Sequence, residues 1–133
     1  MSVSKSFVCI NRKAPYGTIY ALEALEVVLI AGAFEQQVKL IFMDDGVYQL
    51  TQNQNPTGIG MKNFSKTFAA LSDYDVDEIF VDYESLNLRG LDVTDLQQLT
   101  HETSEGEERS SINVVTRTEL GDIIESADIL FNF

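Results

Sequence analysis

The sequence is poor in residues that commonly carry chemistry: its 133 residues include one cysteine, one histidine and no tryptophan. The single cysteine, Cys9, excludes an internal disulfide framework and any metal site built from clustered cysteines. No apolar run reaches the ~18 residues of a transmembrane helix. The first residues also lack the basic and long apolar regions of a secretory signal. Together these absences predict a protein of the reducing cytoplasm.

Basic residues are also scarce, with nine Lys and Arg against 21 Asp and Glu, which gives a net charge of −12. A field of this sign repels the phosphates of nucleic acids and the anionic surface of membranes. We therefore expect neither as a direct partner. Apolar residues make up 44% and charged residues 23% of the chain, near the average of globular proteins. The length then predicts a single domain over residues 1–133.

Runs of β-forming apolar residues alternate with helical patterns along the chain. Five runs predict strands, at residues 5–11, 38–43, 78–82, 112–115 and 128–133. The segments between them predict helices at residues 19–34, from 63 or 65 to about 72, and 118–126. Such alternation favours crossover connections. We expect an α/β domain whose mainly parallel sheet has helices on both faces.

The remaining segments are predicted to be less regular. We expect a helical turn at residues 47–50, a polar surface loop at 51–60 and a turn or short helix at 85–88. The least regular part is predicted at residues 94–111, and it includes a solvated acidic loop at 101–108.

The predicted helix at residues 19–34 is apolar on nearly every side, and its only charged residues are Glu23 and Glu26. A surface helix usually shows one apolar stripe. This helix is therefore either central or covered by another subunit, and a domain this small favours the subunit. The candidate interface residues are Tyr20, Val27, Val28 and Ile30 of the helix, with Tyr48 of the following loop.

Ligands of open parallel sheets bind beyond the carboxyl ends of the strands. Arg12 and Lys13 follow the first strand close to a helix N-terminus, a setting that attracts anions. The segment lacks a glycine-rich phosphate motif, which favours an ordinary turn. Asp44 and Asp45 suit a cation or acid–base chemistry, but no second acidic cluster accompanies them and a capping role is favoured. His101 is expected to be an exposed loop residue.

Cys9 stands between Val8 and Ile10 in the first predicted strand. A reactive thiol needs partial exposure and a setting that stabilises its thiolate. We instead expect a buried, dispensable Cys9 that behaves as a small hydrophobe.

Four segments in the same order resemble the DsrF/TusC family of DsrE-type sulfur-relay proteins: residues 11–18 (NRKAPYGT), 44–50 (DDGVYQL), 58–64 (GIGMKNF) and 85–91 (SLNLRGL). The resemblance extends over residues 5–133 and is weakest at 92–111. The run RKAPYGTIYA followed by EALEVVLI is more similar to the DsrF branch, of dissimilatory sulfur oxidation, than to the TusC branch, of tRNA thiolation.

This resemblance implies a flavodoxin-like fold with a five-stranded parallel sheet and no cofactor or metal. It also implies a heterohexamer with DsrE-like and DsrH-like subunits, two copies of each. In the sulfur-carrying relatives a cysteine follows the third strand, and Asp82 and Tyr83 stand at that position here. A carboxylate cannot hold a persulfide. The resemblance therefore implies a structural subunit without catalytic residues.

Two kinds of function stay open from the sequence. The first is an interaction subunit of a sulfur relay, serving sulfur oxidation or, if TusC-like, tRNA 2-thiolation. The second is a small flavodoxin-like enzyme or ligand-binding module that uses Arg12, Lys13, Asp44 and Asp45, since one fold hosts many chemistries. The first requires an exposed apolar patch, and the second requires a pocket with converging polar groups.

Overall fold

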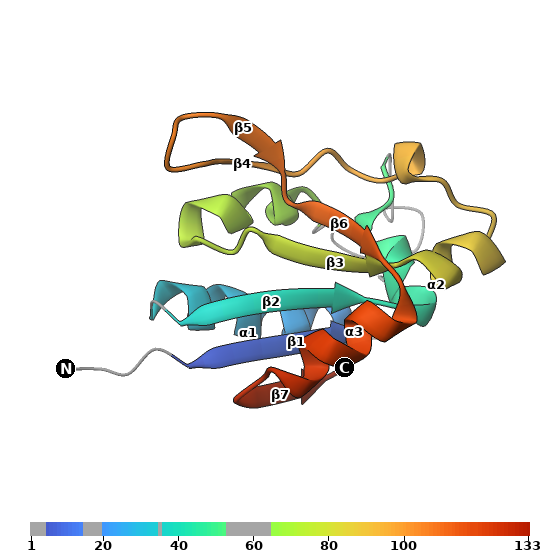
Figure 1. The fold of residues 1–133 in the computed structure, drawn as a ribbon, viewed down its shortest axis with the longest axis horizontal. Coiled ribbons are helices and arrows are strands. Elements are labelled where there is room, and N and C mark those ends of the chain that lie inside the picture. The colour runs from blue at the N-terminus through green and yellow to red at the C-terminus, as the bar shows by residue number, and fades with distance from the viewer. Residues whose placement is uncertain (1–4, 15–19, 35, 53–64) are drawn as a thin grey trace.

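The computed structural model describes residues 5–14, 20–34, 36–52 and 65–133, which form one central sheet with helices on both faces (Figure 1). The five strands are β1 (Ser6–Asn11), β2 (Gln37–Phe42), β3 (Glu78–Asp82), β6 (Ile112–Val115) and β7 (Ile129–Asn132). Their order is β6-β3-β2-β1-β7, and every neighbouring pair is parallel. The predicted α/β class and five-stranded parallel sheet are confirmed.

The continuous apolar run of β1 reflects its place inside the sheet, between β2 and β7. Side chains alternate along a strand, so Phe7 and Cys9 face one layer of the core while Val8 and Ile10 face the other. Strands covered on both faces need apolar residues at successive positions. The strand predicted around Cys9 is thus confirmed, together with the burial of its thiol at 1% exposure.

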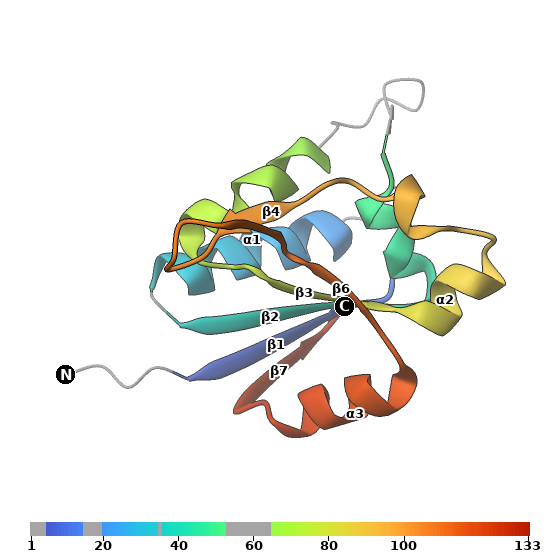
Figure 2. The same cartoon turned by 45° about the horizontal axis from the view of Figure 1, so that its top comes forward.

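Two layers of helices cover the sheet (Figure 2). One face carries α1 (Tyr20–Ala33) and the 3₁₀ helix η3 (Ser65–Tyr74), and the other carries α3 (Arg117–Glu125). The amphipathic helix α3 inserts Leu120 between Val8, Ile10 and Ile41. None of the helices in the described ranges is long and apolar enough to cross a bilayer.

Two short helices follow strands at the carboxyl edge of the sheet: η1 (Asp44–Leu50) after β2, and α2 (Tyr83–Leu88) after β3. The predicted turn at 47–50 and the short helix at 85–88 are therefore present, each a few residues longer than expected. Residues 53–60 of the predicted polar loop and the possible helix start at Asn63 lie outside the described residues.

The prediction for residues 94–111 was wrong in part. The structure has a short 3₁₀ helix, η4 (Val93–Asp95), and an antiparallel hairpin of β4 (Thr100–Glu102) and β5 (Glu108–Ser110). His101 lies in β4 and is half-buried, with Nδ1 2.9 Å from Ser111 Oγ. It is therefore not the exposed loop histidine expected, because the hairpin folds its side chain against the start of β6.

Candidate functional site

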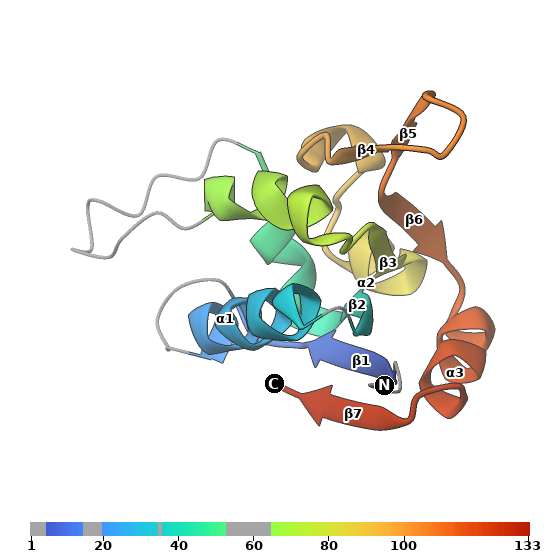
Figure 3. The ribbon, with the colours of Figure 1, turned by 90° about the vertical axis from the view of Figure 1, so that its left-hand side faces the viewer.

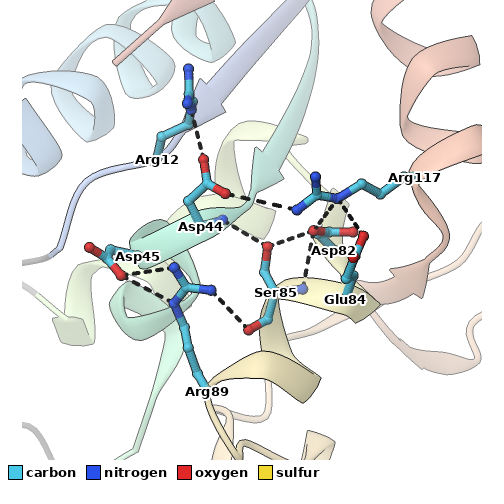
Figure 4. Close-up of polar contacts among 8 residues, drawn as sticks. All are labelled: Arg12, Asp44, Asp45, Asp82, Glu84, Ser85, Arg89 and Arg117. Atoms are coloured by element: carbon cyan, nitrogen blue, oxygen red, sulfur yellow. Dashed lines mark hydrogen bonds and ion pairs between the residues drawn. The ribbon is translucent and has the colours of Figure 1, made fainter.

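The carboxyl edge of the sheet is the usual ligand edge of this architecture, and here it holds a network of charged side chains (Figure 4). These residues come from the carboxyl end of β3 and from the segments that follow β1, β2, β3 and β6, so the sheet brings together positions more than 100 residues apart. The network consists of Arg12, Asp44, Asp45, Asp82, Glu84, Ser85, Arg89 and Arg117.

Asp82 is the last residue of β3 and the N-cap of α2. It is 0% exposed, and its Oδ2 accepts hydrogen bonds from the amide and the hydroxyl of Ser85 at 3.2 and 2.5 Å. A side-chain oxygen at an N-cap satisfies one of the amides that a helix leaves free at its start. The carboxylate of Asp82 therefore has a structural task in this chain.

Arg117 joins α3 to this edge. It is the first residue of α3, capped by Thr116, and its Nε lies 3.1 Å from Asp82 Oδ2 and 3.0 Å from Glu84 Oε2. The carboxylate of Asp82 raises the pKa of the Arg117 guanidinium, with smaller contributions from Glu84 and Asp44. Arg117 thus stays charged and balances the buried carboxylate.

The two neighbouring aspartates point to different partners. Asp44 Oδ2 accepts from Arg12 Nε at 2.9 Å, while Asp45 Oδ1 accepts from Nε and Nη2 of Arg89 at 3.1 and 3.0 Å. The backbone of Asp44 has φ of 51°, a left-handed conformation that aspartate tolerates better than most residues. Its amide donates to Ser85 Oγ at 2.8 Å.

This arrangement suits a structural clamp better than a reactive centre. Arg12, one of the two cations of the anion-site hypothesis, is already paired with Asp44, and the two aspartates do not converge. Ser85 is fully buried, and its hydroxyl donates to Asp82. Within the described ranges, no group of three or more His, Cys, Asp or Glu side chains is placed to hold a metal ion.

Cys9 lies away from this edge, inside the α1 layer of the core. Burial raises the pKa of its thiol to about 12, and a hydrogen bond from Asn11 opposes that rise. The thiol is therefore neutral at physiological pH and shielded from reagents, the opposite of what a sulfur-accepting cysteine requires.

The candidate residues of the sequence analysis fall into different environments. Tyr83, beside the capping Asp82, is 58% exposed. Among the interface candidates, Ile30 is 59% and Tyr48 36% exposed, and Val27 is partly buried. Val28 was wrong as an interface residue, because it is 2% exposed and packs in the core of this chain. The side chain of Tyr20 lies outside the described part.

Sequence reasoning missed the clamp formed by Ser85, Arg89 and Arg117. One local signal was available, because Asp82 precedes a helix and Ser85 stands at its third position, the spacing of a side-chain N-cap. The pairing of Arg117 with Asp82 spans 35 residues, and only the sheet order brings the two together.

Comparisons with known proteins agree with this architecture. The family model of the DsrE/DsrF-like family matches residues 5–133. The chain is 50% identical over 133 residues to "Intracellular sulfur oxidation protein DsrF" of Allochromatium vinosum, covering 98% of each protein. It is 37% identical over 89 residues to "Protein TusC homolog" of Pseudomonas aeruginosa, covering 67% of this chain and 75% of that protein.

Among solved structures, the ychN protein from E. coli superposes with a TM-score of 0.72 at 19% identity, covering 97% of this chain and 99% of that one. That likeness concerns the fold. The family model covers nearly the whole chain, and the DsrF of A. vinosum is half identical along almost its full length. The chain therefore belongs to the DsrE/DsrF-like family.

Proposed function

We propose that this chain is a subunit of a cytoplasmic sulfur-relay complex of the DsrEFH type and does not itself carry sulfur. The observation that carries the proposal is the buried, hydrogen-bonded Asp82 at the carboxyl end of β3. The resemblance to the family implies a cysteine at this position in the sulfur-carrying relatives. Sulfur carriage requires an accessible thiol, and the one cysteine of the chain is 1% exposed.

We place the complex in dissimilatory sulfur oxidation rather than in tRNA 2-thiolation. The likeness to DsrF of A. vinosum extends over 98% of the chain at 50% identity, whereas the likeness to the TusC homolog of P. aeruginosa extends over 67% at 37% identity. In the proposed assembly, DsrE-like and DsrH-like subunits join this one as a heterohexamer with two copies of each.

The alternative of a small anion-binding enzyme is less well supported. Its predicted cation Arg12 and both predicted acids are engaged in ion pairs with one another or with Arg89 and Arg117. An incoming anion would have to displace a carboxylate that is already held in place.

Co-expression with the DsrE-like and DsrH-like neighbours, followed by native mass spectrometry, tests the proposed assembly. We expect one species whose mass equals two copies of each chain. Purification of this chain alone, as a monomer or homo-oligomer with neither neighbour attached, would contradict the proposal.

A further inference from the structure

The sheet face under α1 is left partly uncovered toward β7. Aromatic rings continue across this face, with Phe7 stacked on Phe131 at a centroid distance of 5.9 Å and Phe131 on Phe133 at 6.5 Å. Helix α1 packs over β1 and β2, and in the described part of the chain no helix lies over β7 on this side (Figure 3). Parallel sheets normally have both faces covered by helices, so the β7 end lacks a layer.

A groove of about 470 Å³ opens between α1 and this uncovered edge. Its walls are mainly apolar, formed by Phe7, Val27, Ile30, Ala31, Phe34 and Phe131 together with the polar Lys5 and Gln36. Ile30 is 59% and Phe34 73% exposed. Neighbouring exposed apolar side chains next to an open groove are typical of a protein contact surface.

The exposed stripe of α1 changes character along the helix. Residues spaced three or four apart share one helix face, so Glu23, Val27, Ile30 and Phe34 form a row, with Glu26 one turn before Ile30. Glu23 and Glu26 are both exposed. The stripe is therefore acidic in its first half and apolar in its second.

We propose that this groove receives an amphipathic helix of a different subunit. The apolar side chains of that helix contact Ile30, Phe34 and Phe131, and its basic side chains lie beside Glu23 and Glu26. Complementary charge fixes the register of such a helix and rejects wrong partners. The inference rests on the proposed function, since the incoming helix belongs to another subunit of the same complex.

A second copy of this chain fits the groove poorly. Two copies of α1 crossing antiparallel at Ile30 would place Glu26 of one copy against Phe34 of the other, burying a carboxylate without a partner. Each copy also carries a net charge of −12, which opposes self-association. The same charge favours a partner with a basic contact surface.

Substitutions at the apolar end test the contact. Ile30→Lys or Phe34→Lys should raise the dissociation constant for the co-expressed DsrE-like and DsrH-like subunits by at least roughly 30-fold, the scale of an interface hot spot. Leu88→Lys is the matched control, because Leu88 lies on α2 and is 71% exposed. It should bind as the wild type does.

Charge reversal tests the acidic end. The double variant Glu23→Lys/Glu26→Lys should weaken the complex roughly tenfold at low salt, the effect of losing complementary charge. The control is Asp122→Lys/Glu125→Lys on α3, which has the same spacing, exposure and change of net charge. Tighter binding of the α1 variant, or equal loss in both, would contradict the basic partner.

The alkylation rate of an introduced cysteine tests the contact without relying on weakened binding. Cys9 is 1% exposed, so an Ile30→Cys variant has one accessible thiol. Its alkylation should slow at least about tenfold in the complex, as for a group that is protected by a partner, while that of Leu88→Cys stays unchanged.

If the wild type forms no complex, the proposed function fails. If the complex forms and Ile30→Cys stays equally reactive, only the groove proposal is overturned. A homodimer dissociated by Ile30→Lys would replace the proposed partner with a second copy.

Discussion

At the scale of single residues, Cys9 and Asp82 are both buried, and each has a structural role. The sulfur atom of Cys9 is buried between β1, α1 and the rest of the core, and the buried carboxylate of Asp82 caps α2 at the carboxyl edge of the sheet. The burial of Cys9 was predictable, because its neighbours along the strand are apolar. The capping of α2 by Asp82 had a local signal in Ser85, but its ion pair with Arg117, 35 residues further on, had none.

Burial of Cys9 makes stability depend on pH in the alkaline range. Its pKa rises from the ordinary 9.0 to about 12 on folding, so between these values the native state holds a proton that the unfolded state has lost. Stability from this group is complete below pH 9 and falls as the pH rises toward 12, by at most about 1.4 kcal/mol per pH unit.

Urea unfolding at pH 8 and pH 10 checks this dependence. The wild type should lose more stability between the two pH values than Cys9→Ala, which lacks the thiol. Equal losses of stability in the wild type and in Cys9→Ala would contradict the pH dependence expected from the buried thiol. At pH 8, Cys9→Ala should cost about 1 kcal/mol for the small cavity, and Cys9→Ser somewhat more, because it buries a hydroxyl.

Asp82 is predicted to stabilise the fold as the N-cap of α2. Asp82→Ala should lower the free energy of unfolding by about 2–4 kcal/mol, since it removes the N-cap and leaves buried donors of Ser85 unpaired. Asp82→Asn should cost only about 1 kcal/mol, because asparagine also caps well. Glu84→Gln, at a side chain 56% exposed, should stay within about 0.5 kcal/mol. Similar losses in all three variants would argue against the cap.

At the scale of elements, the contact of η1 with the end of β1 depends on a glycine. A Cβ at Gly46 would lie 1.9 Å from the backbone oxygen of Asn11, so Gly46→Ala must push the two segments apart. We expect a loss of about 3 kcal/mol or more, measured by urea unfolding. Gly121, with no atom within 4 Å of an added Cβ, is the matched control. Gly121→Ala should be neutral or stabilise α3 by up to about 1 kcal/mol. A tolerated Gly46→Ala would show that η1 is held loosely.

Elements with a clear apolar run or a long helical pattern could be predicted from the sequence, whereas the short polar strands could not. The apolar runs of β1, β2 and β3 and the long pattern of α1 locate those elements within one or two residues. The hairpin was not predicted because β4 and β5 are only three residues long, and their sequences, THE and ERS, are polar throughout. Charged strands of this length show no alternation, and cross-strand contacts such as Thr100 Oγ1 to Glu108 Oε1 at 2.7 Å are invisible in a linear sequence.

At the scale of the whole molecule, the carboxyl edge of the sheet and the groove beside α1 differ in chemical character. The carboxyl edge of the sheet, where chemistry usually occurs, is filled by mutually paired arginines and carboxylates. The groove between α1 and β7 is mainly apolar and open. Such a distribution favours a scaffold that presents contact surface to neighbouring subunits. Sequence reasoning predicted contact through α1 but could not tell the core side of the helix, at Val28, from the open side, at Ile30.

Intact mass measured on each chain of the complex, after incubation with a persulfide donor, tests the central claim most directly. This chain should keep its mass, while a partner chain with an accessible cysteine should gain about 32 Da, the mass of one sulfur atom. A Tyr83→Cys variant, at a position 58% exposed, should react with thiol reagents and thereby show that this edge is within reach. A stoichiometric gain of about 32 Da on the wild-type chain, with Cys9 as its one cysteine, would contradict both the buried thiol and the non-carrying role.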